Sequence, residues 1–206
     1  MRLIFILLFF VFFSCENEET VFLPKSNFSI VTEIKDLSPV YIFFKVGGKD
    51  TMAEVNRRNT IISTNWVFNI DKRLPLRFVI PEVMKLQDKK RNDSAHKNEL
   101  AQNYYTYTDS IKKNLAFLPF TDIYYKIEKP KIGAIVYFKK NQEIVIEGKV
   151  LTRENLKDYL KSLPIEQSNK LIFCFDKDLD YGSYIQHKIV VENLNLKDRS
   201  NEEYIY

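Results

Sequence analysis

The sequence contains few of the residues from which metal, phosphate and disulfide sites are built. Its 206 residues include two cysteines, two histidines and five glycines. Two cysteines are too few for a disulfide framework, and no histidines and cysteines stand at the spacing of a metal site. A glycine-rich loop of the phosphate-binding type is also missing. We therefore expect no metal and no other cofactor, and we expect that the protein is not an enzyme.

A cluster of basic charge is missing as well. The formal net charge is +4, because 31 lysines and arginines are nearly balanced by 27 acidic residues. The densest basic run, Lys89-Lys90-Arg91, stands between Asp88 and Asp93. Such a mixed run is typical of a solvated loop or helix end rather than of a phosphate-binding surface. We therefore expect no nucleic-acid partner.

No apolar run is long enough to cross a membrane as a helix. The run from Leu3 to Phe13 has eleven residues, whereas a membrane-spanning helix needs about 20. Arg2 precedes this run, and Ser14 and Cys15 follow it. A short apolar run in this setting is typical of a signal peptide. We expect residues 1–14 to be a signal peptide that is removed.

The end of this segment resembles the signal of bacterial lipoproteins, in which a small residue, here Ser14, precedes a cysteine that carries lipid. The resemblance implies cleavage before Cys15 and attachment to a membrane through lipid on Cys15. Phe12 and Phe13 depart from the usual pattern, which looks looser in lipoproteins of Bacteroidetes. An ordinary secretory signal with a chance cysteine is the alternative. We expect residues 15–34 to form a lipidated tether.

The acidic sequence Glu16-Asn17-Glu18-Glu19 directly follows the cysteine. It resembles the signal that sends some Bacteroidetes lipoproteins to the cell surface, although short acidic stretches are usually solvated linker. The expected location is the cell envelope, at the periplasmic or the surface face of the outer membrane.

The rest of the chain has the composition of a globular protein. The sequence is 45% hydrophobic and 14% aromatic, which is enough material for a large core. Of the two cysteines, Cys15 is assigned to lipid and Cys174 lies in an apolar run. A free cysteine in such a run behaves as a small hydrophobic residue. We therefore expect Cys174 to be part of a central strand.

Alternating and helical patterns predict the elements of the C-terminal third. We expect a hairpin of strands 133–138 and 143–147, a helix 152–163, a strand 171–175, a helix that Asp180 caps, and an edge strand 204–206. This order, ββαβα(β), gives each helix one apolar face to bury against the sheet. The sequence therefore predicts a two-layer α+β sandwich.

The front half repeats part of this plan. Residues 66–74, WVFNIDKRL, align with residues 171–179, LIFCFDKDL, at an offset of 105, and Phe44-Lys45 align with Phe138-Lys139 at an offset of 94. The difference, 105 − 94 = 11 residues, is about three helical turns, the length of the helix 152–163. We predict two degenerate modules of one kind: residues 35–128, with a helical insertion, and residues 129–206.

Helical segments are also expected in the first module, at residues 82–90 and 95–113. In the second segment, Leu100, Tyr104, Tyr107 and Ile111 recur at helical spacing. The tyrosines of residues 104–107 are candidates for stacking on a glycan or peptide. Their spacing favours a role in the core.

The second module resembles the periplasmic domain of ExbD/TolR proteins. The resemblance covers residues 133–194 well and residues 38–87 only faintly, and it includes the helix that starts at Glu154 and the sequence Asp176-Lys177-Asp178-Leu179-Asp180-Tyr181-Gly182. It implies docking on an envelope protein or on peptidoglycan, in transport or envelope integrity. The apolar segment of this chain contains no acidic residue that could carry protons. We therefore expect a non-enzymatic, lipid-anchored docking module, with a lipid-anchored hydrolase as the alternative.

Four residues are candidates for docking or for shaping turns: Asp71, Asp176, Asp180 and Tyr181. Asp176 is expected to accept hydrogen bonds from backbone amides after its strand, and Asp180 is expected to cap a helix. Asp176, Asp178 and Asp180 also match the first half of a calcium loop, but the second half does not fit, because Gly182 and His187 stand at the wrong positions. His187 is expected on the exposed side of its helix, and His96 in a polar loop.

Overall fold

The structure, a computed structural model, describes residues 20–47, 50–93, 95, 98–162, 171–194, 196 and 199–206. The signal peptide, Cys15, the acidic residues 16–19 and His96 lie outside these residues, so what is said of them above stays a prediction. Within the described residues, no helix is long and apolar enough to cross a membrane.

The first sheet has six strands and one long helix on its inner face. Its strands are β1 (Lys25–Ser26), β2 (Leu37–Gly47), β3 (Asp50–Asn56), β4 (Asn65–Ile70), β5 (Asn103–Asp109) and β6 (Asn114–Pro119). They lie in the order β1-β5-β4-β2-β3, and β6 pairs with β5. Strands β2, β4 and β5 are parallel, whereas β3 and β6 are antiparallel to their neighbours. Helix α2 (Leu76–Asn92) turns Val79, Ile80 and Val83 into the core.

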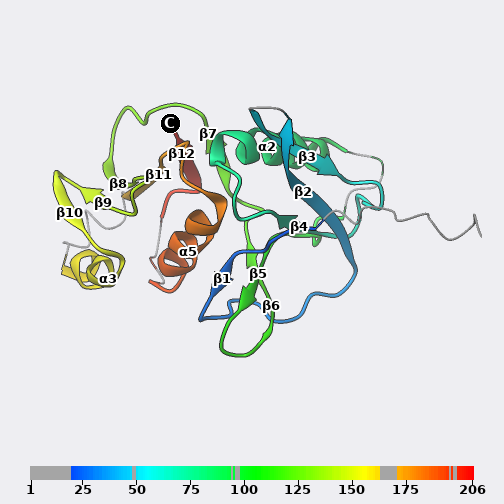
Figure 1. The fold of residues 1–206 in the computed structure, drawn as a ribbon, viewed down its shortest axis with the longest axis horizontal. Helices are drawn as coiled ribbons and strands as arrows, with labels where there is room; N and C mark the ends of the chain where they lie inside the picture. The colour runs from blue at the N-terminus through cyan, green and yellow to red at the C-terminus, as the bar shows by residue number, and fades with distance from the viewer. Residues whose placement is uncertain are drawn as a thin grey trace, which may run out of the picture.

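The second sheet also has six strands. They are β7 (Tyr124–Lys126), β8 (Ala134–Phe138), β9 (Ile144–Ile146), β10 (Lys149–Leu151), β11 (Leu171–Phe175) and β12 (Glu202–Ile205), in the order β10-β9-β8-β11-β12-β7. Helices α3 (Arg153–Ser162) and α5 (Tyr181–Glu192) belong to this half. Figure 1 shows the second sheet beside the first, with α5 between them.

The two halves have one topology. Each contains a short strand (β1 or β7), a hairpin (β2–β3 or β8–β9), a strand parallel to the first hairpin strand (β4 or β11), a helix (α2 or α5) and a last parallel strand (β5 or β12). The order of these strands across the sheet is the same in both halves. The predicted α+β fold of two sandwich-like modules is confirmed.

Strand register corrects the alignment of the two hairpins. Ile42 pairs with Ile70, and Phe138 pairs with Phe175. Ile42 is therefore equivalent to Phe138, an offset of 138 − 42 = 96 rather than the predicted 94. The second copy thus gains 105 − 96 = 9 residues in this region. Strand β2 continues five residues past Ile42, to Gly47, whereas β8 ends at Phe138.

The helix predicted at residues 95–113 is wrong, because β5 occupies residues 103–109. Tyrosine and threonine alternate here, and Tyr105 and Tyr107 are fully buried on one face of the strand. Aromatic and β-branched residues at period two favour a strand. Leu100 and Ile111, which extended the supposed helical face, are both exposed.

Two further elements differ from the prediction. The C-terminal strand β12 is not at the edge of its sheet, because it pairs with β11 on one side and with β7 on the other. Strand β7 comes before residue 129, so the second sheet includes residues 124–126 from the range assigned to the first module. Helix α2 begins at Leu76 rather than at residue 82, and Pro81 lies inside it.

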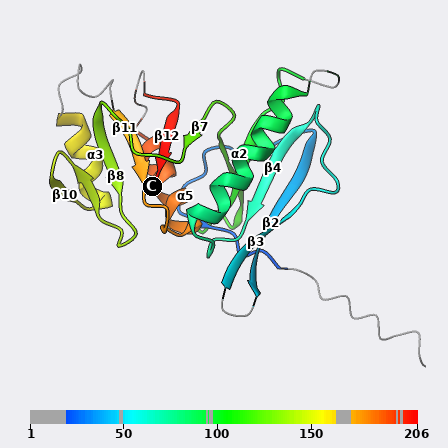
Figure 2. The same cartoon turned by 90° about the horizontal axis from the view of Figure 1, so that it is seen from above.

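One continuous hydrophobic core joins the two modules. It contains Trp66 and Phe68 of β4, Phe138 of β8 and Phe175 of β11 in a single cluster of buried residues. Helix α5 is buried along most of its circumference, which is typical of a helix that packs on two sides. Figure 2 shows α5 next to α2, so this helix separates the two sheets.

Candidate functional site at the junction of the modules

The loops that follow β4 and β11 meet in a symmetric backbone contact. Four hydrogen bonds join them: Leu76 N to Leu179 O (2.9 Å), Tyr181 N to Leu74 O (2.8 Å), Arg77 N to Lys177 O (2.8 Å) and Gly182 N to Lys72 O (3.0 Å). Equivalent residues of the two modules differ by 105 in number. Exchanging each residue for its equivalent turns the first bond into the second and the third bond into the fourth. The modules are therefore related by an approximate two-fold axis through this junction.

Asp71 stabilises the first of these loops. Its carboxylate is fully buried and accepts hydrogen bonds from the amides of Arg73 (3.0 Å) and Phe22 (3.2 Å). The Arg73 guanidinium donates two more, at 2.8 Å each. Burial opposes ionisation, but the hydrogen bonds from Arg73 and Phe22 outweigh it and lower the pKa of Asp71. The carboxylate is fully used within the fold.

Asp176 and Asp180 act in the second loop as predicted. Asp176 Oδ1 accepts a hydrogen bond from the amide of Asp178 at 2.8 Å, which fixes the turn after β11. Asp180 Oδ1 accepts from the amide of Ser183 at 2.8 Å, so it caps α5. These are roles for a strand end and a helix start.

Tyr181 lies in the core rather than at the surface. It is fully buried, and its ring packs edge-on against Tyr105 of the first module at a centroid distance of 5.7 Å. Its hydroxyl has no hydrogen-bond partner among the described residues. Of the four predicted site residues, three therefore shape the junction loops and one fills the core beneath them.

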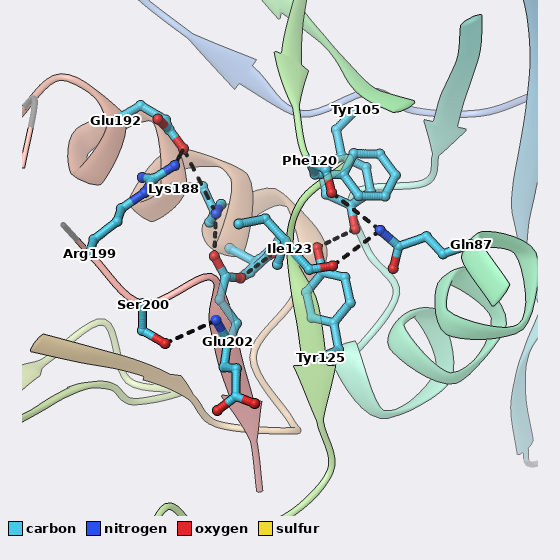
Figure 3. A network of polar contacts seen from close by, with 12 residues as sticks. Gln87, Tyr105, Phe120, Ile123, Tyr125, Lys188, Glu192, Arg199, Ser200 and Glu202 are labelled. Atoms are coloured by element: carbon cyan, nitrogen blue, oxygen red, sulfur yellow. Dashed lines mark hydrogen bonds and ion pairs between the residues drawn. The ribbon is translucent and has the colours of Figure 1, made fainter. Parts of the chain in front are cut away.

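A chain of buried polar side chains crosses the junction (Figure 3). The Tyr105 hydroxyl of β5 lies 2.7 Å from that of Tyr125 in β7, which lies 3.1 Å from that of Tyr184 in α5. Tyr184 donates to Glu203 Oε2 at 2.8 Å, and Lys188 donates to Glu203 Oε1. Burial raises the pKa of all three tyrosines well above the usual value. The hydroxyls therefore stay protonated.

Sequence reasoning missed this chain of contacts. Its members come from β5, β7, α5 and β12, and no short motif contains them. Lys188 follows Tyr184 by four residues on α5, which places both on one helix face. This spacing is the one local pattern in the sequence that links two members of the chain of contacts. Contacts between distant segments depend on the tertiary fold.

The prediction that His187 lies on the exposed side of α5 is wrong, because its side chain is fully buried. Its ring lies 4.6 Å from that of Phe138, and neither ring nitrogen has a hydrogen-bond partner among the described residues. Burial, helped by the positive charge of Arg153, lowers the pKa of His187 to about 3. The imidazole is therefore neutral at physiological pH.

Cys174 lies in β11 and is fully buried, as expected of a small hydrophobic residue. Burial raises the pKa of its thiol to about 12. A thiol that stays protonated is a poor nucleophile. This residue offers no reactive group.

A polar cavity of about 360 Å³ lies at the end of α2, beside Lys90 and Arg91. Lys90 is buried, and its ammonium group donates to Thr64 O (2.9 Å), Gln102 O (3.2 Å) and Asn103 Oδ1 (3.1 Å). Burial lowers the pKa of Lys90 to about 8. The Lys90 ammonium group already donates to three oxygen atoms of the protein, so it is not available to bind a ligand in this cavity.

The described residues do not assemble a metal centre. Within them, no group of three or more histidine, cysteine and acidic residues could hold a metal ion. His187, Cys174 and the buried tyrosines, whose pKa values are shifted by burial, lie in the core. Comparison with known proteins adds nothing to this picture: no protein-family model, no curated protein and no solved structure matches the chain.

Proposed function

We propose that this protein is a lipid-anchored envelope protein that docks a partner and carries out no chemistry. The signal-like N-terminus with Cys15 supports the anchor, and the resemblance of the second module to ExbD/TolR domains supports docking in transport or envelope integrity. The partner is an envelope protein, with peptidoglycan as the second candidate.

A free sheet edge is the observation that carries docking. Strand β3 has seven residues and, among the described strands, pairs with β2 alone. The other sheet edges have fewer unpaired backbone groups. Strands β7 and β10 have three residues each, and the edge strand β6 already pairs with Val31 at Phe117. An edge with unpaired backbone groups binds an extended segment of another protein by adding a strand.

The register shows which amides of β3 are available. Ile42 O accepts a hydrogen bond from Asp71 N, so the backbone of Ile42 faces β4. Its neighbour Phe43 therefore faces β3, where it pairs with Glu54. Because hydrogen-bonding direction alternates along a strand, the amides of Ala53 and Val55 point away from β2.

The alternative, a hydrolase, needs a concave site with convergent acids. Asp71 is buried and paired with Arg73, and Asp176 holds a turn. Neither carboxylate is available to activate water. This arrangement favours docking over hydrolysis.

The test uses two substitutions at one position. Ala53→Pro removes one outward amide and is compatible with an edge strand, whereas Ala53→Ser keeps the amide. Each lipidated protein is used to capture partners from envelope extract and is mixed with purified peptidoglycan in a sedimentation assay. We expect capture of a discrete protein by wild type and Ala53→Ser, and at least a tenfold loss with Ala53→Pro.

Two results would contradict strand addition. One is equal capture by all three proteins, and the other is no capture above that of an unrelated lipoprotein. Cosedimentation with peptidoglycan that Ala53→Pro leaves unchanged would assign docking to the polymer and to another surface. Metabolic labelling with a fatty acid, lost in Cys15→Ser, tests the anchor separately.

A further inference from the structure

The hairpin of β2 and β3 reaches beyond the sheet to which it belongs. Strand β2 pairs with β4 only up to Ile42, and its last five residues pair with β3 alone. Five strand residues extend about 17 Å. Figure 2 shows this hairpin projecting from the body of the first module. The equivalent strand of the second module, β8, ends at Phe138 and has no such projection.

The projecting part carries exposed apolar side chains. Val46 is 66% exposed and Met52 is 53% exposed. These side chains add little to the hydrophobic core, because no other described element covers them. Exposed apolar residues on a projecting tip indicate a surface that is buried in another environment.

The start of the described chain continues this surface. Phe22 is 49% exposed, and the Arg73 guanidinium lies 4.7 Å from its ring and 4.4 Å from the ring of Phe44. Phe44 lies two residues before Val46 and therefore on the same face of β2, whereas Met52 pairs with Lys45 and lies on the opposite face of the projecting hairpin. We call Phe22, Phe44, Val46 and Met52 the apolar tip surface.

The tether limits how far this surface can be from the lipid. Hydrogen bonds fix Phe22 to the body, because its amide donates to Asp71 and its carbonyl accepts from Lys72. Only seven residue steps separate Cys15 from Phe22, and a fully extended chain covers at most about 25 Å in that number. A lipid on Cys15 thus keeps the end of the sheet that carries the tip close to the bilayer.

We propose that the apolar tip surface inserts into the lipid bilayer and sets the orientation of the protein on the membrane. This inference rests on the proposed anchor at Cys15. Val46 and Met52 enter the interfacial region, Phe22 lies at the level of the headgroups, and the exposed side chain of Lys72 faces their phosphates. The membrane is the occupant of these side chains, whereas the β3 edge proposed for the partner protein presents the backbone amides of Ala53 and Val55.

The experiment places the anchor chemically, so that it does not depend on lipidation in the cell. The mature chain beginning at Cys15 is coupled through that thiol to a maleimide phospholipid in phosphatidylcholine vesicles. Cys174 is fully buried and does not compete for the reagent. Fluorescence of Val46→Trp is compared in vesicles with and without brominated acyl chains, which quench tryptophan on contact.

A matched control is available on the same strand. Leu37 is apolar and 47% exposed, but it begins β2, nine residues from Val46 and about 30 Å away. The native Trp66 is fully buried and provides the background in both variants. Both substitutions are at exposed sites, and unchanged circular dichroism and urea midpoints confirm that each variant folds.

We expect brominated lipid to reduce the emission of the added Val46→Trp side chain at least twofold and to leave Leu37→Trp at the wild-type level. Equal quenching of both variants, or of neither, would overturn the proposal. A blue shift of Val46→Trp at high protein concentration without vesicles would also overturn it, because it assigns the tip to contact between copies. Absence of metabolic labelling in the wild-type protein, or labelling that persists in Cys15→Ser, would instead refute the anchor of the proposed function.

Discussion

His187 illustrates at the scale of one residue how burial determines protonation. Its imidazole lies against Phe138, without a hydrogen-bond partner among the described residues. The folded state therefore holds the neutral form, with a pKa of about 3. The unfolded chain binds a proton near pH 6.5. Between these two values the unfolded state binds more protons, so stability falls as the pH falls below about 6.5.

We expect the replacement His187→Phe to remove this dependence. Between pH 7.5 and pH 5, wild type should lose about 2 kcal/mol more of its unfolding free energy than the variant, because one group contributes at most about 1.4 kcal/mol per pH unit. Urea unfolding at both pH values measures this difference. Parallel losses in the two proteins would show that His187 does not titrate as described.

Some residue roles can be predicted from the sequence because they depend on near neighbours. Asp176 and Asp180 bind amides two and three residues away, and local signals of turns and helix caps identify them. Glu203 depends on Tyr184 and Lys188, which are brought to it by the packing of α5 on β12. The burial of Tyr181 likewise depends on Tyr105 of the first module, and the burial of His187 depends on Phe138 of β8.

At the scale of elements, the prediction succeeded where one pattern had no competitor. The hairpin β8–β9, strand β11 and helix α5 were all expected. Residues 103–109 carry two patterns, since tyrosines at positions 104 and 107 fit a helix while the alternation of tyrosine and threonine fits a strand. The neighbouring strands β4 and β6 decide in favour of the strand.

The ion pair between Lys188 of α5 and Glu203 of β12 joins a helix to the central part of its sheet. Both side chains are almost fully buried. We expect Lys188→Met and Glu203→Gln each to lower the unfolding free energy by about 3 kcal/mol, because each removes the ion pair and leaves the opposite buried charge only partly compensated. The double variant should cost less than the sum by at least about 1 kcal/mol.

A surface pair provides the control for this cycle. Lys85 and Glu82 lie 2.7 Å apart on α2, but the lysine is largely exposed. Replacing either residue should change stability by less than about 0.5 kcal/mol. Urea unfolding at pH 7 measures all variants, and additive effects of Lys188→Met and Glu203→Gln would refute the coupling.

At the scale of the molecule, two copies of one module share a single core. Their likeness could be predicted from residues 66–74 and 171–179, because the turn sequence was retained in both. Their packing could not be predicted, because it depends on backbone hydrogen bonds between the loops and on Tyr105 and Tyr181 meeting across the junction. Strand β7, just before residue 129, also lies in the second sheet.

We expect the two modules to unfold together. The chain contains one tryptophan, Trp66, which is buried in the first module, and Cys174 is buried in the second. In a Cys15→Ser chain, tryptophan fluorescence and thiol reactivity should therefore give the same urea midpoint, as in a two-state transition. Two separate midpoints would show that the shared core does not couple the modules.

The symmetric junction has a consequence for how the molecule responds to dilution. Two separate copies that met through the same loops would form a dimer, whose stability depends on protein concentration. Here the copies are one chain, so the contact is intramolecular, and the linker fixes the effective concentration of one half at the other. A single molecule therefore keeps both halves together at any dilution, and each half can change its sequence without the same change being imposed on its counterpart.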